Sequence, residues 1–162
     1  MDTVGFAVED LLSDAEDALI AKDRPVGLVV FAPGNNVVWD NCCAASDGGG
    51  QLWVRVVSVL PQPAGAQPCD ITDLQVRVGL GVVRCMLGGD EEGFPTAEEM
   101  LEDARGAGRD AEILLTAIRD WAGTQHVNLK SLRVEQGLPL GPQGYCGGWE
   151  WTLVFRVLMQ RD

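Results

Sequence analysis

Apolar residues recur every three to four positions along the first 23 residues, and this spacing predicts an amphipathic helix. Acidic residues occupy most of the remaining positions. The apolar stripe consists of Val4, Val8, Leu11, Leu12, Ala15 and Leu19. Pro25 follows the expected end of the helix, a place where proline is common. We therefore expect the stripe to pack against the rest of the domain and the acids to face solvent.

The pattern then changes to short apolar runs that are typical of strands. These runs are residues 25–31, a shorter one near Val37, residues 51–60 and residues 74–86. In the last run, apolar residues alternate with polar residues or glycine, so one face of the strand is apolar. Residues 61–73 contain three prolines and are expected to form a loop, because proline cannot occupy a central strand.

A second helix is predicted to begin near Thr96. Thr96 and Glu99 have the spacing of a capping box, which marks a helix N-terminus. Gly106 and Gly108 favour a kink or a break in the middle of this helix, and its acids are expected on the exposed face. The expected core stripe is Ala97, Leu101, Ala104, Ala111, Leu114, Leu115 and Ile118.

Two further strands, at residues 127–135 and 149–158, complete the order α-β-β-β-α-β-β, to which the short run near Val37 would add one more strand. This order predicts an α+β fold: a single domain over residues 1–162, with a mixed or antiparallel sheet of four to five strands and two helices packed on one face. With 162 residues and 46% hydrophobic content, the chain is long and apolar enough to bury a core. The start of the chain lacks a basic signal-peptide region, and no apolar run approaches the ~20 residues that span a bilayer. We expect a soluble, intracellular protein with no membrane association.

The net charge of −12 is concentrated in the two helical segments. Residues 1–23 carry −6 and residues 90–120 carry −7, which leaves the rest of the chain at about +1. The sequence has no basic cluster, so tight binding of nucleic acid through its phosphates is not expected. The simplest interpretation of each acidic segment is the solvated face of a helix.

The five cysteines have neither the spacing of a disulfide framework nor a CxxC pair. We expect them to be reduced, buried and to behave as small apolar residues. With a single histidine, His126, the sequence predicts no metal site, no cofactor and no catalytic residues. A small thiol-dependent enzyme that uses Asp40, Cys42, Cys43 or His126 stays as an alternative.

Residues 141–148, GPQGYCGG, hold four glycines directly before the last predicted strand. A phosphate-binding loop would precede a helix and would carry a lysine. A nucleophile elbow would place its serine or cysteine between a strand and a helix. Neither context surrounds Cys146, so we expect this segment to be a hairpin connection that is available for contact with a neighbouring molecule.

Four of the predicted strands each carry an arginine, on faces that also carry apolar residues; these are Arg55, Arg77, Arg133 and Arg156. Exposed apolar patches usually mark contacts. Acidic helices and arginine-bearing strands in one subunit favour a head-to-tail contact between copies, which closes into a ring if the rotation allows. The alternative is that each arginine lies over its own sheet. The candidate interface residues are Trp53, Arg55, Arg77, Arg133, Gly147, Gly148, Glu150 and Arg156.

The order of elements and several local phrases resemble the tail-terminator, or head-to-tail connector, proteins of long non-contractile-tailed actinobacteriophages. The phrases are RPVGLVVFAPG, VVWDNCC, GQLWVRV and GPQGYCGGWEWT. The resemblance covers most of the chain.

This resemblance implies a structural virion protein of the tail or neck, assembled in the host cytoplasm and without catalytic residues or cofactor. It implies a homo-oligomer, a six-membered ring that ends polymerisation of the tail tube and joins the tail to the head-side connector or stopper protein. DNA would pass through the lumen without specific binding, and acidic subunits suit such a lumen because like charge discourages phosphate contacts. A head-side connector or stopper of the same neck is the nearest alternative.

Overall fold

Two helices and five strands follow one another in the predicted order α-β-β-β-α-β-β, which confirms the α+β fold class. The computed structural model describes residues 2–34, 36–37, 39, 42–43, 49–63, 71–86, 95–123, 128–143 and 145–158. The elements are α1 (Asp2–Ala21), β1 (Leu28–Pro33), β2 (Gln51–Pro63), β3 (Ile71–Cys85), α2 (Ala97–Trp121), β4 (Asn128–Gln143) and β5 (Cys146–Leu158).

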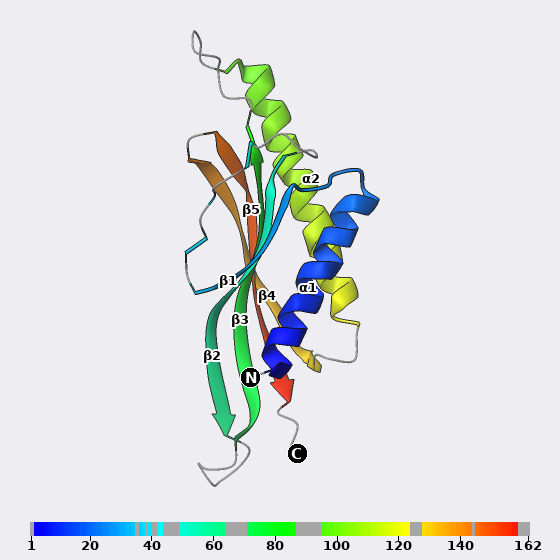
Figure 1. The fold of residues 1–162 in the computed structure, drawn as a ribbon, viewed down its shortest axis with the longest axis vertical. Helices are drawn as coiled ribbons and strands as arrows, with labels where there is room; N and C mark the ends of the chain where they lie inside the picture. Colours follow the sequence, from blue (N-terminus) through cyan, green and yellow to red (C-terminus); the bar gives the residue numbers. More distant parts are fainter. Residues whose placement is uncertain are drawn as a thin grey trace.

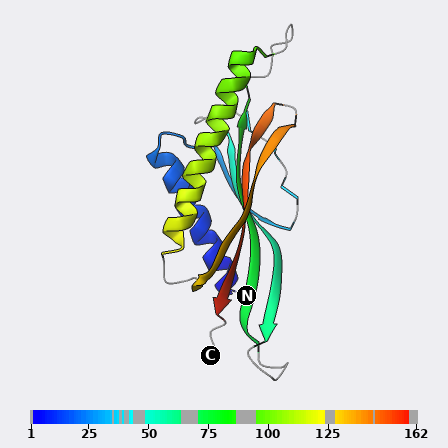
Figure 2. The same cartoon turned by 180° about the vertical axis from the view of Figure 1, so that it is seen from behind.

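The five strands form one mixed sheet in the order β1-β2-β3-β5-β4. β1 runs parallel to β2, and the other neighbouring pairs are antiparallel. Both helices lie on the same side of the sheet (Figures 1 and 2). We call the opposite side of the sheet the open face.

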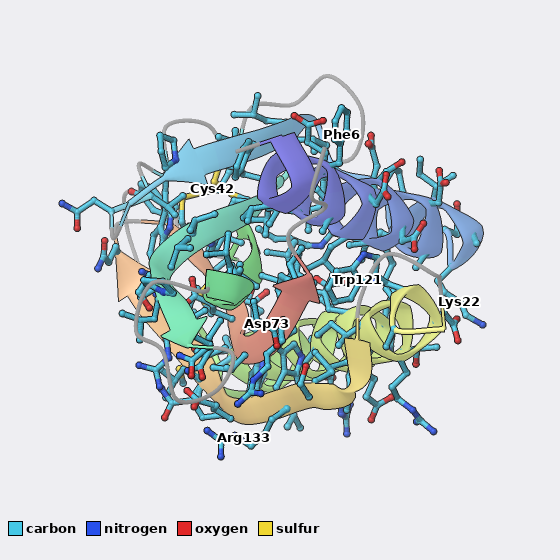
Figure 3. All side chains as sticks on the ribbon, turned by 90° about the horizontal axis from the view of Figure 1, so that it is seen from below. Phe6, Lys22, Cys42, Asp73, Trp121 and Arg133 are labelled. Atoms are coloured by element: carbon cyan, nitrogen blue, oxygen red, sulfur yellow. A yellow bond between two sulfur atoms is a disulfide. The ribbon has the colours of Figure 1, made fainter. Side chains whose placement is uncertain are left out.

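The main core fills the space between the helices and the sheet. All six apolar positions of the predicted α1 stripe are buried. β3 contributes four side chains from alternate positions, which agrees with the predicted alternation. Trp121 of α2 and Phe155 of β5 make an edge-to-face contact in this layer, with ring centroids 5.1 Å apart, and Figure 3 shows Trp121 between the helices and the sheet. The four β3 residues are Val76, Val78, Leu80 and Val82.

The hairpin of β2 and β3 is longer than the sequence predicted. β2 continues through Pro63 and β3 begins at Ile71, so the proline-containing segment is partly strand. β1 pairs with β2 only as far as Val56. Beyond Val56, β2 is therefore an edge strand, where Pro61 and Pro63 are tolerated because no neighbour requires their missing N–H groups.

A β-bulge at Val57 changes which residues share a face of β2. Before the bulge Val56 is opposite Val78, and after it Ser58 is opposite Arg77 and Val59 is opposite Val76. Val59 therefore lies on the face opposite to Arg55, although simple alternation along the strand would put the two residues on the same face.

α2 is one continuous helix of 25 residues, so the predicted break at Gly106 and Gly108 is wrong. Its second half packs on the sheet, but its first turns extend beyond α1 (Figure 1). For this reason the first part of the predicted core stripe, including Leu101, is exposed. Among the described residues, no helix has the length and apolar character needed to cross a membrane.

A second, smaller apolar cluster covers one end of the open face. It contains Trp53 and Val83 from the sheet together with Cys42, Val37 and Trp39 from the connection between β1 and β2. Val37 and Trp39 are not in a strand, so the short strand predicted near Val37 is not present at these two residues. The chain thus covers part of a surface that we expected to be available for a partner.

Four of the five cysteines form disulfides in this region, Cys42–Cys146 and Cys43–Cys85. The expectation of reduced cysteines is therefore wrong for these four, and Cys43 and Cys85 are also exposed. Spacing along the sequence gave no indication, because the pairs form only when the β1–β2 connection folds over the ends of β3 and β5. Cys69 lies outside the described residues.

The glycine-rich segment is a hairpin, as predicted, but its glycines lie largely within the strands. β4 continues to Gln143 and β5 begins at Cys146. A Cβ on Gly148 would lie 1.9 Å from the carbonyl oxygen of Val82, and one on Gly147 would lie 2.1 Å from the sulfur of Met86. Gly148 therefore allows β5 to approach the backbone of β3 closely, and Gly147 leaves room for the Met86 side chain.

Candidate functional site

The open face of β3 has glycines at two successive outward positions, Gly79 and Gly81. The register places Trp53 of β2 and Glu150 of β5 on either side of Gly81. A Cβ on Gly81 would lie 2.3 Å from Trp53 Cζ2. A Cβ on Gly79 would lie 2.9 Å from Arg55 Nε and from Glu150 Cδ. The missing side chains leave room for β2 and β5 residues to meet across β3.

Glu150 is the centre of the hydrogen-bond network that fills this space. Its Oε2 accepts hydrogen bonds from Trp53 Nε1 at 3.1 Å and from Arg55 Nε at 2.9 Å, and its Oε1 accepts one from Arg55 Nη2 at 2.6 Å. Glu150 is 6% exposed and Trp53 1% exposed. The side-chain hydrogen bond with Glu150 raises the pKa of Arg55, and this effect outweighs burial, which lowers it. The network holds three strands of one subunit together.

A second ionic group lies on the same face and is exposed. Glu135 of β4 accepts hydrogen bonds from Arg77 Nη2 on one oxygen and from Arg133 Nη2, at 2.9 Å, on the other. The side chains of Arg77 and Arg133 are 46% and 71% exposed. Burial raises the pKa of Glu135, but the hydrogen bonds from the two arginines outweigh it and the pKa is lowered.

Arg156 of β5 adds a third exposed cation to this part of the open face. It makes no ion pair with any residue that the structure describes. Asp73 of β3 is on the same face by register and is half-buried. We call Arg77, Arg133 and Arg156 the arginine patch; Figure 3 shows Arg133 at the outer edge of the molecule.

The eight predicted interface residues therefore fall into two groups. Trp53, Gly147, Gly148 and Glu150 are buried within the subunit, and Arg55 is bound to Glu150. The residues of the arginine patch remain accessible to a partner. A role in subunit contacts stays a prediction for all eight, and only the arginine patch offers substantial charged surface for it.

Exposed acids dominate the helix side of the molecule. The exposed acidic side chains are Glu9, Asp10 and Asp17 on α1 and Glu98, Glu99, Glu102, Glu112 and Asp120 on α2. Burial raises the pKa of Asp14, and repulsion from Asp10, Asp17 and Asp120 raises it further. Carboxylates of the two helices thus lie close enough to repel one another.

Asp110 of α2 is an ionic centre that the sequence analysis missed, because all the acids of this helix were expected to be exposed. Asp110 is 2% exposed and accepts hydrogen bonds from two arginines. Arg24 binds it through Nε and, at 2.9 Å, through Nη2. Arg84 of β3 binds it through Nε at 2.7 Å and also donates to the backbone carbonyls of Arg24, Pro25 and Gly49. The hydrogen bond with Asp110 raises the pKa of Arg24, while burial opposes it.

One signal in the sequence identifies Asp110 as unusual. It precedes Leu114 by four residues and Ala117 by seven, which places it on the core stripe of α2 rather than on the acidic face. A carboxylate on an apolar stripe requires a buried partner. This group fastens α2 to β3 and to the connection after α1, and none of its residues lies on the open face.

The alternative of a thiol-dependent enzyme depends on Asp40, Cys42, Cys43 and His126. Cys42 and Cys43 are in disulfides, and a disulfide sulfur is not a thiolate nucleophile. Asp40 and His126 lie outside the described residues. Within the described ranges, no group of three or more histidine, cysteine, aspartate or glutamate side chains is arranged to hold a metal ion.

The charged surfaces on opposite sides of the subunit are therefore the candidate functional site. Comparison with models of known protein families and with curated proteins gives no match for this chain.

Proposed function

We propose that the protein is a structural subunit of a bacteriophage tail, a tail terminator that assembles into a ring at the top of the tail tube. The ring ends tube polymerisation and joins the tail to the head-side connector. The proposal derives from the resemblance of the sequence phrases and from the arrangement of charge on the folded subunit.

Charge complementarity between the two sides of the subunit carries this proposal. The helix side exposes eight carboxylates on α1 and α2. The open face exposes the three side chains of the arginine patch, of which Arg77 and Arg133 bind the carboxylate of Glu135. In a head-to-tail arrangement the helices of one copy would meet the arginine patch of the next, and such a contact uses two different surfaces, as a closed ring requires.

The covered end of the open face supports the same arrangement of copies. Trp53 at that end is covered by the chain's own β1–β2 connection. A second copy would therefore meet the end of the sheet that carries Arg77, Arg133 and Arg156. The ring would have six subunits, as the resemblance implies.

The experiment that tests this function combines charge reversal with sedimentation at several salt concentrations. We expect the wild-type protein to form a closed oligomer at low salt and high protein concentration, and to dissociate as salt screens the contact. An Arg133→Glu/Arg156→Glu variant should remain monomeric under the same conditions. Arg119→Glu, a matched reversal of an exposed arginine on α2, should still assemble.

Unchanged assembly of the double reversal variant would contradict the proposed contact. A wild-type protein that remains monomeric at low salt and at the highest attainable concentration would contradict self-assembly itself.

A further inference from the structure

Four sulfur atoms lie together at the covered end of the open face. Cys42 and Cys43 belong to the β1–β2 connection, Cys85 is the last residue of β3, and Cys146 is the first residue of β5. The disulfides are Cys42–Cys146 and Cys43–Cys85. They join adjacent residues of the connection to adjacent strands of the sheet.

The two disulfides are neighbours at both of their ends. At one end, the Sγ atoms of Cys42 and Cys43 are 3.6 Å apart. At the other end, Cys85 and Cys146 are directly opposite one another in the antiparallel register. Opposite residues of such a pair have Cα atoms about 4.5–5.5 Å apart, which is within the range of roughly 4.4–6.8 Å that a disulfide spans. The same four sulfurs therefore offer a second pairing, Cys42–Cys43 and Cys85–Cys146. A Cys42–Cys43 bond would join consecutive residues, whose Cα atoms are about 3.8 Å apart, so this bond is shorter in span than a usual disulfide and only the Cys85–Cys146 bond has the usual span.

The two disulfides differ in their access to solvent. Cys42 is 2% exposed and Cys146 9% exposed, and both belong to the apolar cluster around Trp53. Cys43 and Cys85 are exposed. An external thiol can therefore reach the Cys43–Cys85 bond but not the Cys42–Cys146 bond.

We infer that these cysteines form a thiol–disulfide exchange site, at which a monothiol catalyses conversion between the two pairings. The thiolate of the monothiol attacks Cys85 Sγ, breaks the Cys43–Cys85 bond and releases the Cys43 thiolate. That thiolate attacks the neighbouring Cys42 Sγ, forms Cys42–Cys43 and releases the Cys146 thiolate. Cys146 then attacks Cys85 Sγ in the mixed disulfide, forms Cys85–Cys146 and releases the monothiol.

The conversion is balanced without an oxidant or a reductant. Two disulfides are present at the start and at the end, and the monothiol is regenerated as its thiolate. Attack on Cys43 instead of Cys85 leads to the same product, because the released Cys85 thiolate is then opposite Cys146.

The conversion changes how the β1–β2 connection is held. In the first pairing, two covalent bonds join Cys42 and Cys43 to the sheet. In the second pairing, no disulfide joins either residue to the sheet, and the contact of Val37 and Trp39 with the Trp53 cluster is apolar packing. The exchange therefore releases the cover of the open face while the sheet gains a cross-strand bond.

Peptide mapping of the full chain tests this inference, because trypsin separates the cysteines. Cys42 and Cys43 lie on residues 23–55, Cys85 on residues 85–105 and Cys146 on residues 134–156. The protein would carry Cys69→Ala, so that the fifth cysteine supplies no thiol. It would be incubated with 2-mercaptoethanol without oxygen, quenched with acid and N-ethylmaleimide, and digested without reduction.

Before exchange, all three peptides should be joined in one species. During exchange, a cross-link between residues 85–105 and 134–156 should appear at a rate proportional to the thiol concentration, together with a free 23–55 peptide that carries an internal disulfide. The total number of thiols should not change. Persistence of the three-peptide species, or opening to alkylated thiols without that cross-link, would overturn the inference.

The Cys43→Ser/Cys85→Ser variant is the matched control for access. It retains only the buried Cys42–Cys146 bond, which should survive the same treatment. Opening of this bond at the wild-type rate would show that the thiol does not enter through the exposed pair, and would also overturn the inference.

Discussion

At the level of single residues, two positions of β3 have no side chain and so leave space on the open face of the sheet. Gly79 and Gly81 leave room for Trp53, Arg55 and Glu150 to meet across the strand, and their mutual hydrogen bonds satisfy the buried carboxylate. Glycine at these positions is needed for close approach of side chains and not for backbone freedom, since neither has a positive φ. The alternating pattern in the sequence placed glycines on one face of β3, but it did not show that side chains of β2 and β5 meet over them.

Replacement of Gly81 tests this role. We expect Gly81→Ala to lower the free energy of unfolding by about 1–3 kcal/mol, because the new methyl group would displace the Trp53 ring. Chemical denaturation measures the change. Gly108→Ala is the matched control: a Cβ there meets nothing within 4 Å, so it should raise stability by about 0.5–1 kcal/mol through helix propensity.

Asp110 provides a second test at this scale. Asp110→Ala would leave Arg24 and Arg84 without their shared carboxylate, so we expect a loss of about 3–5 kcal/mol in the free energy of unfolding. Arg105→Ala removes an exposed pair with Glu102 and should change stability by less than about 1 kcal/mol. Equal effects of the two variants in a urea titration would contradict the structural role of Asp110.

Asp14 makes stability depend on pH. Its pKa is raised above 3.8 in the folded protein by burial and by neighbouring carboxylates, so protonation favours the folded state and ionisation opposes it. The loss of stability caused by ionised Asp14 is absent below the pKa that Asp14 has in the unfolded chain. It develops as the pH rises through the higher pKa that Asp14 has in the folded protein. Asp14→Asn should therefore raise the melting temperature at pH 7 and lose this advantage below about pH 4. An equal gain at both pH values would contradict this account.

At the level of elements, the sequence predicted the identity and order of every helix and strand but not all of their extents. The capping box at Thr96 and Glu99 is present at the start of α2, because it depends only on local spacing. The β2–β3 hairpin was underestimated because the tolerance of Pro61 and Pro63 depends on where β1 ends. The length of the buried apolar stripe of α2 was overestimated, because the periodicity of apolar residues does not show where the sheet that the helix packs on ends.

The first turns of α2 should consequently depend on their cap more than on packing. The N–H groups of Thr96 and Glu99 bond to each other's side chains, and the backbone hydrogen bond from Thr96 is the main reason that the pKa of Glu99 is lowered. Thr96→Ala should cost about 1 kcal/mol. Because this part of α2 lies off the sheet, hydrogen exchange of its amides should accelerate about fivefold.

Thr116→Ala is the control for the cap. Thr116 is exposed within the same helix and donates only to the carbonyl of Glu112. Its replacement should leave exchange in the first turns of α2 unchanged. Acceleration by both variants would show that the first turns respond to general loss of helix stability and not to the cap.

At the level of the whole molecule, the candidate site was only partly predictable. The sequence predicted the charge imbalance and the strands that carry arginine. The buried pairing of Arg55 with Glu150, the covering of Trp53 and the two disulfides were not, because each depends on contacts between segments far apart in the chain. What remains is a subunit with acidic helices on one side and the arginine patch on the other.

Electron microscopy of the purified protein at low salt tests the proposed assembly most directly. Contact between the acidic helices of one copy and the arginine patch of the next predicts rings with a central opening, whose side-by-side copies present opposite faces to each other. Particles the size of one subunit, or oligomers in which the arginine patch faces solvent in every copy, would contradict it.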